Sequence, residues 1–157
     1  MGLGFFRLVT LLGALFVLFM ESAFGPLDLR SPQWEDLGFP REVPRPRGVI
    51  VSQGRDLGGG IGDWAVIFRL KIPPDQIAPL VDALCRFYRG KEYTVSDSET
   101  IDSNLCSSII EKQKVEWWRP DKLTHPRVII LQFREAKGLW IAYSEESGVM
   151  YLVDWAI

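Results

Sequence analysis

An uncharged run near the N-terminus is the feature that most limits what this chain can fold into. From Leu8 to Met20 the sequence reads LVTLLGALFVLFM, with Arg7 before it and Glu21 after it. A segment that is apolar on every face does not suit an amphipathic helix on the surface of a soluble domain. We therefore expect residues 1–24 to form an N-terminal hydrophobic helix that is separate from the folded domain.

This segment has two possible fates. A run of this length matches the apolar region of a signal peptide, but the only suitable pair of small residues before a cleavage site, Ala23 and Gly25, is followed by Pro26. Proline disfavours cleavage because it lacks a backbone N–H and has a fixed φ. Residues 3–20 would instead give a helix of about 27 Å if Arg7 reaches the interface. The sequence favours a retained signal anchor and leaves a cleaved signal peptide open.

The charges around the segment predict its orientation. Arg7 and the amino terminus lie on one side, and Glu21 and Asp28 lie on the other. Positive charge favours the cytoplasmic side of a membrane. We expect a protein anchored in the membrane through residues 3–20, with its C-terminal domain outside the cytoplasm. The alternative is a secreted or periplasmic domain that is released by cleavage.

A proline-rich segment follows the anchor. Residues 25–47 contain five prolines and show no apolar period of a helix or a strand. Proline at this density favours a semi-rigid extended spacer, which Trp34 and Phe39 could pin to the domain. The predicted organisation is therefore an anchor over 1–24, a stalk over 25–47 and a globular domain over 48–157.

The first half of the domain shows two strands and two helices. Alternation over Trp64–Ile72 predicts a strand with one wet face, and a shorter strand begins at Val49. The glycines between them match G-x-G-x-x-A, but a strand follows where a dinucleotide fingerprint needs a helix, so no cofactor is expected. Apolar spacing predicts a helix from Asp75 to Arg89 and a shorter one over about 102–114.

The last third predicts a meander of three strands over 128–133, 139–143 and 149–155. The expected fold is α+β: a mostly antiparallel five-stranded sheet in the order ββααβββ, with helices packed on one face and an N-terminal hydrophobic helix before it.

Composition excludes several functions. The net charge is -2, so we expect no nucleic-acid partner, and one histidine with two cysteines cannot supply four Cys/His metal ligands. Cys85 and Cys106 could close a disulfide worth about 3 kcal/mol in an oxidising compartment, or could be two buried thiols.

The residues Trp117, Trp118 and Arg119 are the candidates for binding. Pro120 favours an extended backbone before it, and neighbours in an extended chain point to opposite sides. One tryptophan should therefore be accessible, as a platform for a glycan or a peptide, unless the stalk or Arg119 covers it.

Two hypotheses of function follow. The first is a membrane-tethered or exported binding or accessory module outside the cytoplasmic membrane, with an unknown protein or glycan partner. The second is an exported enzyme of unknown reaction that uses His125, the only histidine, with a nearby carboxylate. No motif of the sequence requires an enzyme.

Overall fold

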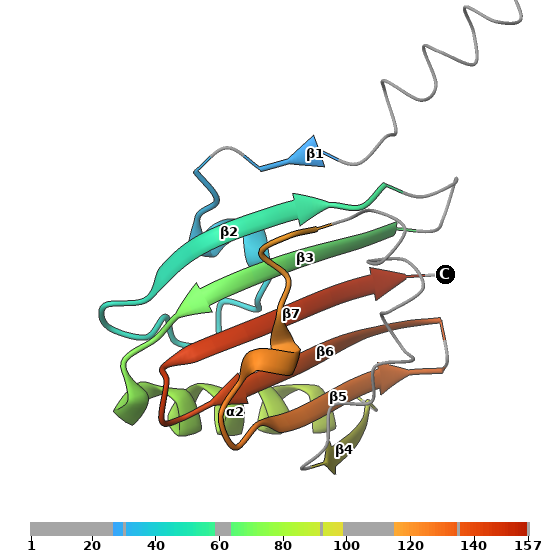
Figure 1. Cartoon of the computed structure of the whole chain (residues 1–157). Helices are drawn as coiled ribbons and strands as arrows, with labels where there is room; N and C mark the ends of the chain where they lie inside the picture. Colours follow the sequence, from blue (N-terminus) through green and yellow to red (C-terminus); the bar gives the residue numbers. More distant parts are fainter. Residues whose placement is uncertain are drawn as a thin grey trace, which may run out of the picture.

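A seven-stranded antiparallel sheet is the frame of this protein (Figure 1). The computed structural model describes residues 27–29, 31–58, 64–91, 93–98, 115–134 and 136–156. The order across the sheet is β1-β2-β3-β7-β6-β5-β4. The strands are β1 (Leu27–Asp28), β2 (Ile50–Asp56), β3 (Trp64–Lys71), β4 (Thr94–Ser98), β5 (Arg127–Phe133), β6 (Lys137–Ser144) and β7 (Val149–Ala156).

The predicted C-terminal meander is confirmed. Strands β5, β6 and β7 pair in sequence order, and the β6–β7 register runs without a break from Lys137↔Ala156 to Ser144↔Val149. The other side of β7 pairs with β3. This pairing joins the meander to the β2–β3 hairpin, so β7 lies at the centre of the sheet.

The predicted first helix is also confirmed, as α2 (Pro74–Arg89). It begins one residue before Asp75, which lies in its first turn and not at its N-cap. Four apolar side chains on one stripe, Ile77, Leu80, Val81 and Leu84, are buried against the sheet. Their burial fixes α2 on one face of the sheet.

Both faces of the sheet carry a hydrophobic core. In β3, Phe68 and Leu70 belong to the core under α2, whereas Ala65 and Ile67 belong to a second core on the opposite face. The prediction that one face of this strand is wet is therefore wrong, since Ile67 is 0% exposed. The segment that includes Val115, Trp118 and Leu123 covers the second face.

The proline-rich segment packs on the sheet instead of standing away from it. Trp34, Leu37 and Val43 are buried in the same core as α2, and the Trp34 and Phe39 rings meet edge to face with centroids 5.1 Å apart. A short 3-10 helix, η1 (Trp34–Leu37), carries the first two of these side chains. Residues 31–49 thus contribute directly to the core. This agrees with the expectation that Trp34 and Phe39 could pin the segment to the domain.

The expected fold class is wrong. The sheet has seven strands where five were expected, and the described residues are mostly β with one α-helix. The order ββααβββ fails because β4 follows α2 directly. Its sequence, TVSDS, contains one apolar residue, so hydrophobic periodicity gives no strand signal there. Polar residues of this kind are common on edge strands.

The expected hydrophobic helices are not part of the described fold. The N-terminal helix over 1–24 and the second helix over 102–114 lie outside the described residues. Within the described ranges, no helix is both long and apolar enough to cross a membrane.

Replacement of Leu84 by alanine tests the packing of α2. The Leu84 side chain is 0% exposed and lies in the core under α2, so Leu84→Ala should lower the free energy of unfolding by about 2 to 5 kcal/mol. Arg86→Ala on the exposed side of the same helix should change it by less than about 0.5 kcal/mol. Urea denaturation measures both, and equal effects would contradict this placement of the helix.

Candidate binding groove

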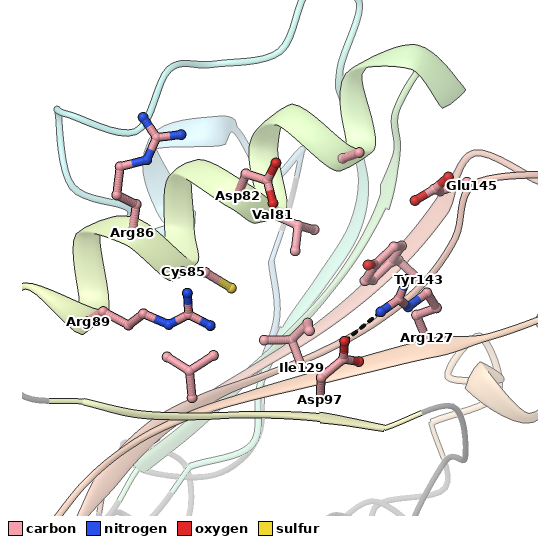
Figure 2. Close-up of a pocket in the computed structure, with 12 residues that line it drawn as sticks. Val81, Asp82, Cys85, Arg86, Arg89, Asp97, Arg127, Ile129, Tyr143 and Glu145 are labelled. Carbon is pink, nitrogen blue, oxygen red and sulfur yellow. Dashed lines mark hydrogen bonds and ion pairs between the residues drawn. The ribbon is translucent and has the colours of Figure 1, made fainter.

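A groove of about 490 Å³ opens between α2 and the edge of the sheet formed by β4, β5 and β6 (Figure 2). One wall is α2, and the floor and second wall come from the three strands. The lining residues are Ala78, Val81, Asp82, Cys85, Arg86 and Arg89 from the helix, with Val95, Asp97, Arg127, Ile129, Tyr143 and Glu145 from the strands and the turn after β6.

The periods of the helix and the strands bring these residues together. Ala78, Asp82, Cys85 and Arg89 follow one another at intervals of three or four residues, so they share a stripe beside the buried one. On β4, β5 and β6 the odd-numbered residues point to the helix side, and the register pairs Asp97 with Ile129 and Arg127 with Tyr143. The groove therefore lies where β4, β5 and β6 extend beyond the part of the sheet that α2 covers.

An ion pair crosses the floor of the groove. Arg127 donates from Nη2 to Oδ2 of Asp97, and this hydrogen bond raises the pKa of Arg127 (Figure 2). The two side chains are 49% and 47% exposed, so water screens the pair and it adds little to stability. Burial raises the pKa of the neighbouring Tyr143. The phenol therefore stays a neutral hydrogen-bonding group at physiological pH.

The thiol of Cys85 points into the groove (Figure 2). Burial raises the pKa of this thiol, and the nearby charge of Arg89 opposes the rise. A raised pKa keeps the sulfur protonated near pH 7, which makes it a poor nucleophile. Cys106, its proposed disulfide partner, lies outside the described residues, so the bridge stays a prediction.

Charged side chains of both signs line the groove, and the basic pair Arg86 and Arg89 lies at one end of it. Arg86 and Arg89 lie on the last turns of α2 and form no ion pair with any side chain that the structure describes. Figure 2 shows Glu145 at the opposite end of the groove. Two available guanidinium groups therefore lie at one end, and the apolar side chains of Val81 on α2 and Ile129 on β5 lie between them and the end that carries Glu145.

The predicted binding residues lie on the opposite face of the sheet. Trp118 is 8% exposed and belongs to the second core, where its ring centroid lies 5.2 Å from that of Tyr151. Trp117 is half-buried and meets Trp118 edge to face at 6.0 Å. Arg119 is exposed and pairs with Asp121 at 3.3 Å. The two tryptophans differ in burial as expected, but a turn closed by the Trp118 N–H and the Val115 carbonyl replaces the expected extended backbone, and both rings pack against the second core. A binding role for the three residues stays a prediction.

His125 lies at the surface next to a carboxylate. Its Nδ1 is 3.1 Å from Oε2 of Glu146, in the turn between β6 and β7, and the two side chains are 88% and 65% exposed. The arrangement supplies the histidine and acid of the enzyme hypothesis, but both groups stand in water. In the part of the chain that is described, no three His, Cys, Asp or Glu side chains are placed to hold a metal ion.

The sequence did not reveal the groove, because four elements build it and one of them, β4, has no hydrophobic pattern. The one local signal was the pair Arg86 and Arg89 on the polar side of a predicted helix. No family model, curated protein or solved structure matches this chain. The evidence for its function is therefore the chemistry of its own surface.

A partly buried carboxyl group lies near the C-terminal end of α2. Asp154 points to the helix side of β7, where the register places it between Val66 and Leu139. Burial raises the pKa of Asp154 to about 6, although Lys137 opposes the rise. Burial, together with the charge of Asp154, also raises the pKa of Tyr88 to about 12. Asp154 is therefore charged at pH 7 in a site that disfavours its charge.

The two tryptophans should differ in their effect on stability. Trp118→Ala should lower the free energy of unfolding by about 3 to 5 kcal/mol, because it empties a buried site against Tyr151. Trp117→Ala should cost clearly less, since part of its ring is already in water. Thermal and urea denaturation measure both variants. A larger loss in Trp117→Ala would contradict the burial described here.

Asp154 should make the protein less stable as the pH rises. Its pKa is higher in the folded than in the unfolded state, so the folded state binds more protons between about pH 4 and pH 6. The free energy of unfolding should fall by about 1 to 3 kcal/mol as the pH rises through this interval. Asp154→Asn should remove the fall and be the more stable protein at pH 7.5.

Denaturation with urea at pH 4.5 and pH 7.5 measures this dependence. Asp121→Asn is the control, because its Arg119 partner lowers the pKa of that carboxyl and the sign of its contribution is opposite. Equal pH dependence in Asp154→Asn and the unmodified protein would rule out the assignment to Asp154.

Proposed function

We propose that this protein is a binding module that takes up an extended polypeptide segment in the groove between α2 and β4. The observation that carries the proposal is the position of the groove directly beside the terminal strand of the sheet. In the order across the sheet β4 is a terminal strand that pairs with β5, and we place the added segment along the outer backbone edge of residues 94–97.

Addition of a strand to a sheet edge gives affinity through the backbone and specificity through alternate side chains. A segment laid beside β4 would direct every second side chain toward the helix side, where Val95 and Asp97 already point into the groove. Thr94, Val95, Ser96 and Asp97 form the edge on which the proposal rests. Their polar character also protects this edge from nonspecific association.

The charges of the groove favour an acidic segment. Arg86 and Arg89 are exposed at one end, and guanidinium groups bind carboxylates with two parallel hydrogen bonds. The apolar side chains next to them, Val81 on α2 and Ile129 on β5, would hold an apolar side chain of the same segment. The best ligand therefore has an acidic and an apolar side chain two residues apart.

The place where the module works comes from the sequence alone. The anchor at residues 3–20 and the location outside the cytoplasmic membrane are part of the proposal. Residues 3–20 themselves lie outside the described residues. The alternative of an exported enzyme has one supporting observation, the contact of His125 with Glu146. Loss of a measured activity in a folded His125→Ala variant would favour that alternative.

Labelled synthetic peptides test the groove. The probes are two peptides of about eight residues that alternate threonine with valine and carry either glutamate or lysine at one central valine position. Fluorescence anisotropy should give tighter binding of the glutamate peptide. Arg86→Ala/Arg89→Ala should weaken it at least about tenfold, a change of about 1.4 kcal/mol. Arg41→Ala/Arg47→Ala removes the same charge outside the groove and should leave the affinity unchanged.

Steric and chemical readouts locate the bound peptide. Ala78→Trp should block the groove without a folding cost, because Ala78 is an exposed position on α2 that lines it. In a Cys106→Ser protein, the glutamate peptide should slow alkylation of Cys85 by iodoacetamide. Equal affinity for the two peptides, or equal weakening in both arginine double variants, would overturn the proposal.

A further inference from the structure

Four aromatic rings form a continuous row at the C-terminal end of α2. Phe87 meets Tyr88 with ring centroids 5.3 Å apart, Tyr88 meets Tyr93 at 4.7 Å, and Tyr93 meets Phe133 at 5.2 Å. All four side chains are half-buried. Their row links the helix, the segment that leads into β4 and the end of β5.

Three exposed cations lie over the ends of this row. The Lys91 Nζ is 5.7 Å from the centre of the Phe87 ring, and Arg134 Cζ and Lys137 Nζ are 5.1 and 5.2 Å from that of Phe133. We call these seven residues the cationic aromatic patch: Phe87, Tyr88, Lys91, Tyr93, Phe133, Arg134 and Lys137. The rings hold the positive groups at the surface through cation–π contacts.

The register places this patch at the end of the sheet where the chain enters the fold. One row across the sheet aligns Leu27, Asp56, Val66, Asp154 and Leu139. Lys137 lies two residues nearer that end than Leu139. Figure 1 shows the start of β1, the end of β7 and the β5–β6 connection at the same, right-hand end of the sheet.

The chain before β1 limits how far this end can lie from the uncharged run. Six residues, 21–26, separate Met20 from Leu27, so seven Cα–Cα steps join the two residues and span at most about 25 Å when the chain is extended. If the run Leu8–Met20 enters a hydrocarbon layer, the end of the sheet that carries β1 and the patch is held within that distance of the bilayer. The opposite end, with Lys71 and Val149, is farther away by the length of the strands.

We propose that the cationic aromatic patch contacts an anionic lipid surface. Basic groups near such a surface are attracted to its phosphates, and aromatic rings favour the interface between headgroups and chains. The sequence places Glu92 and Glu135 next to the cations, so the attraction is local and modest. The net charge of -2 provides no general basic field for nucleic acid. This inference rests on the membrane anchor of the proposed function and not on peptide binding in the groove.

Lysine footprinting of the full chain in vesicles tests the proposal. The probes are vesicles of phosphatidylcholine alone and of phosphatidylcholine with about one third phosphatidylglycerol, treated with a membrane-impermeant acetylating reagent. Acetylation of Lys91 and Lys137, read by mass spectrometry, should be at least about fivefold slower in the anionic vesicles, and 1 M salt should remove most of the difference. Lys71 and Lys122 lie outside the patch and should react equally in both.

A variant in the patch separates lipid contact from general shielding. Arg134 has a left-handed backbone with φ of 48°, which asparagine tolerates, so Arg134→Asn should keep the fold and reduce the protection of Lys91 and Lys137. Arg41→Asn is the matched control. Equal acetylation of the patch lysines in both vesicles, or equal protection of Lys71, would overturn the proposal. Protection by a DNA duplex and not by anionic vesicles would assign the patch to nucleic acid and overturn it as well.

Discussion

The pairing of β3 with β7 is the interaction on which the rest of this structure depends. It connects a hairpin from the first half of the domain with a meander from the last third, over eight residue pairs from Trp64↔Ala156 to Lys71↔Val149. The two partners are far apart in sequence, so their loop closure has a high entropic cost that burial on both faces must offset. Phe68 and Leu152 on one side, and Ile67 and Val153 on the other, provide that burial.

Because both faces of the sheet are covered, the surfaces that can bind a partner lie at its terminal strands and at the ends of its strands. The centre is filled by α2 and the proline-rich segment on one side and by the segment around Trp118 on the other. Among the described residues, the accessible margins include the terminal strand β4, with the groove beside it, and the end of the sheet that carries the cationic aromatic patch. These two surfaces share the C-terminal half of α2, so a partner in the groove and a lipid surface at the patch would lie near each other.

The partly buried titratable groups of the groove, Cys85 and Tyr143, are poorly suited to catalysis. The thiol of Cys85 and the phenol of Tyr143 have raised pKa values because of burial, which makes both less reactive at neutral pH. Arg86 and Arg89 supply charge and directed hydrogen-bond donors instead. This chemistry suits recognition of a carboxylate better than transfer of a proton or a group, which is why the groove supports a binding module.

The sequence alone determined the elements whose hydrophobic period is strong: the helix Pro74–Arg89, the strand Trp64–Lys71 and the three C-terminal strands. It also predicted that Trp117 and Trp118 differ in burial, but for a reason that the structure does not show: Trp117 lies in a turn closed by the Trp118 N–H and the Val115 carbonyl, and both rings pack against the second core. Only the tertiary structure decided the rest. The β4 edge has a single apolar residue, and the burial of Trp34 and Leu37 depends on a sheet face that residues far along the chain create. The groove is lined by side chains from α2 and from three strands. Which of these side chains lie close together depends on the pairing register of the strands and on the position of the helix, and no local sequence pattern predicts either.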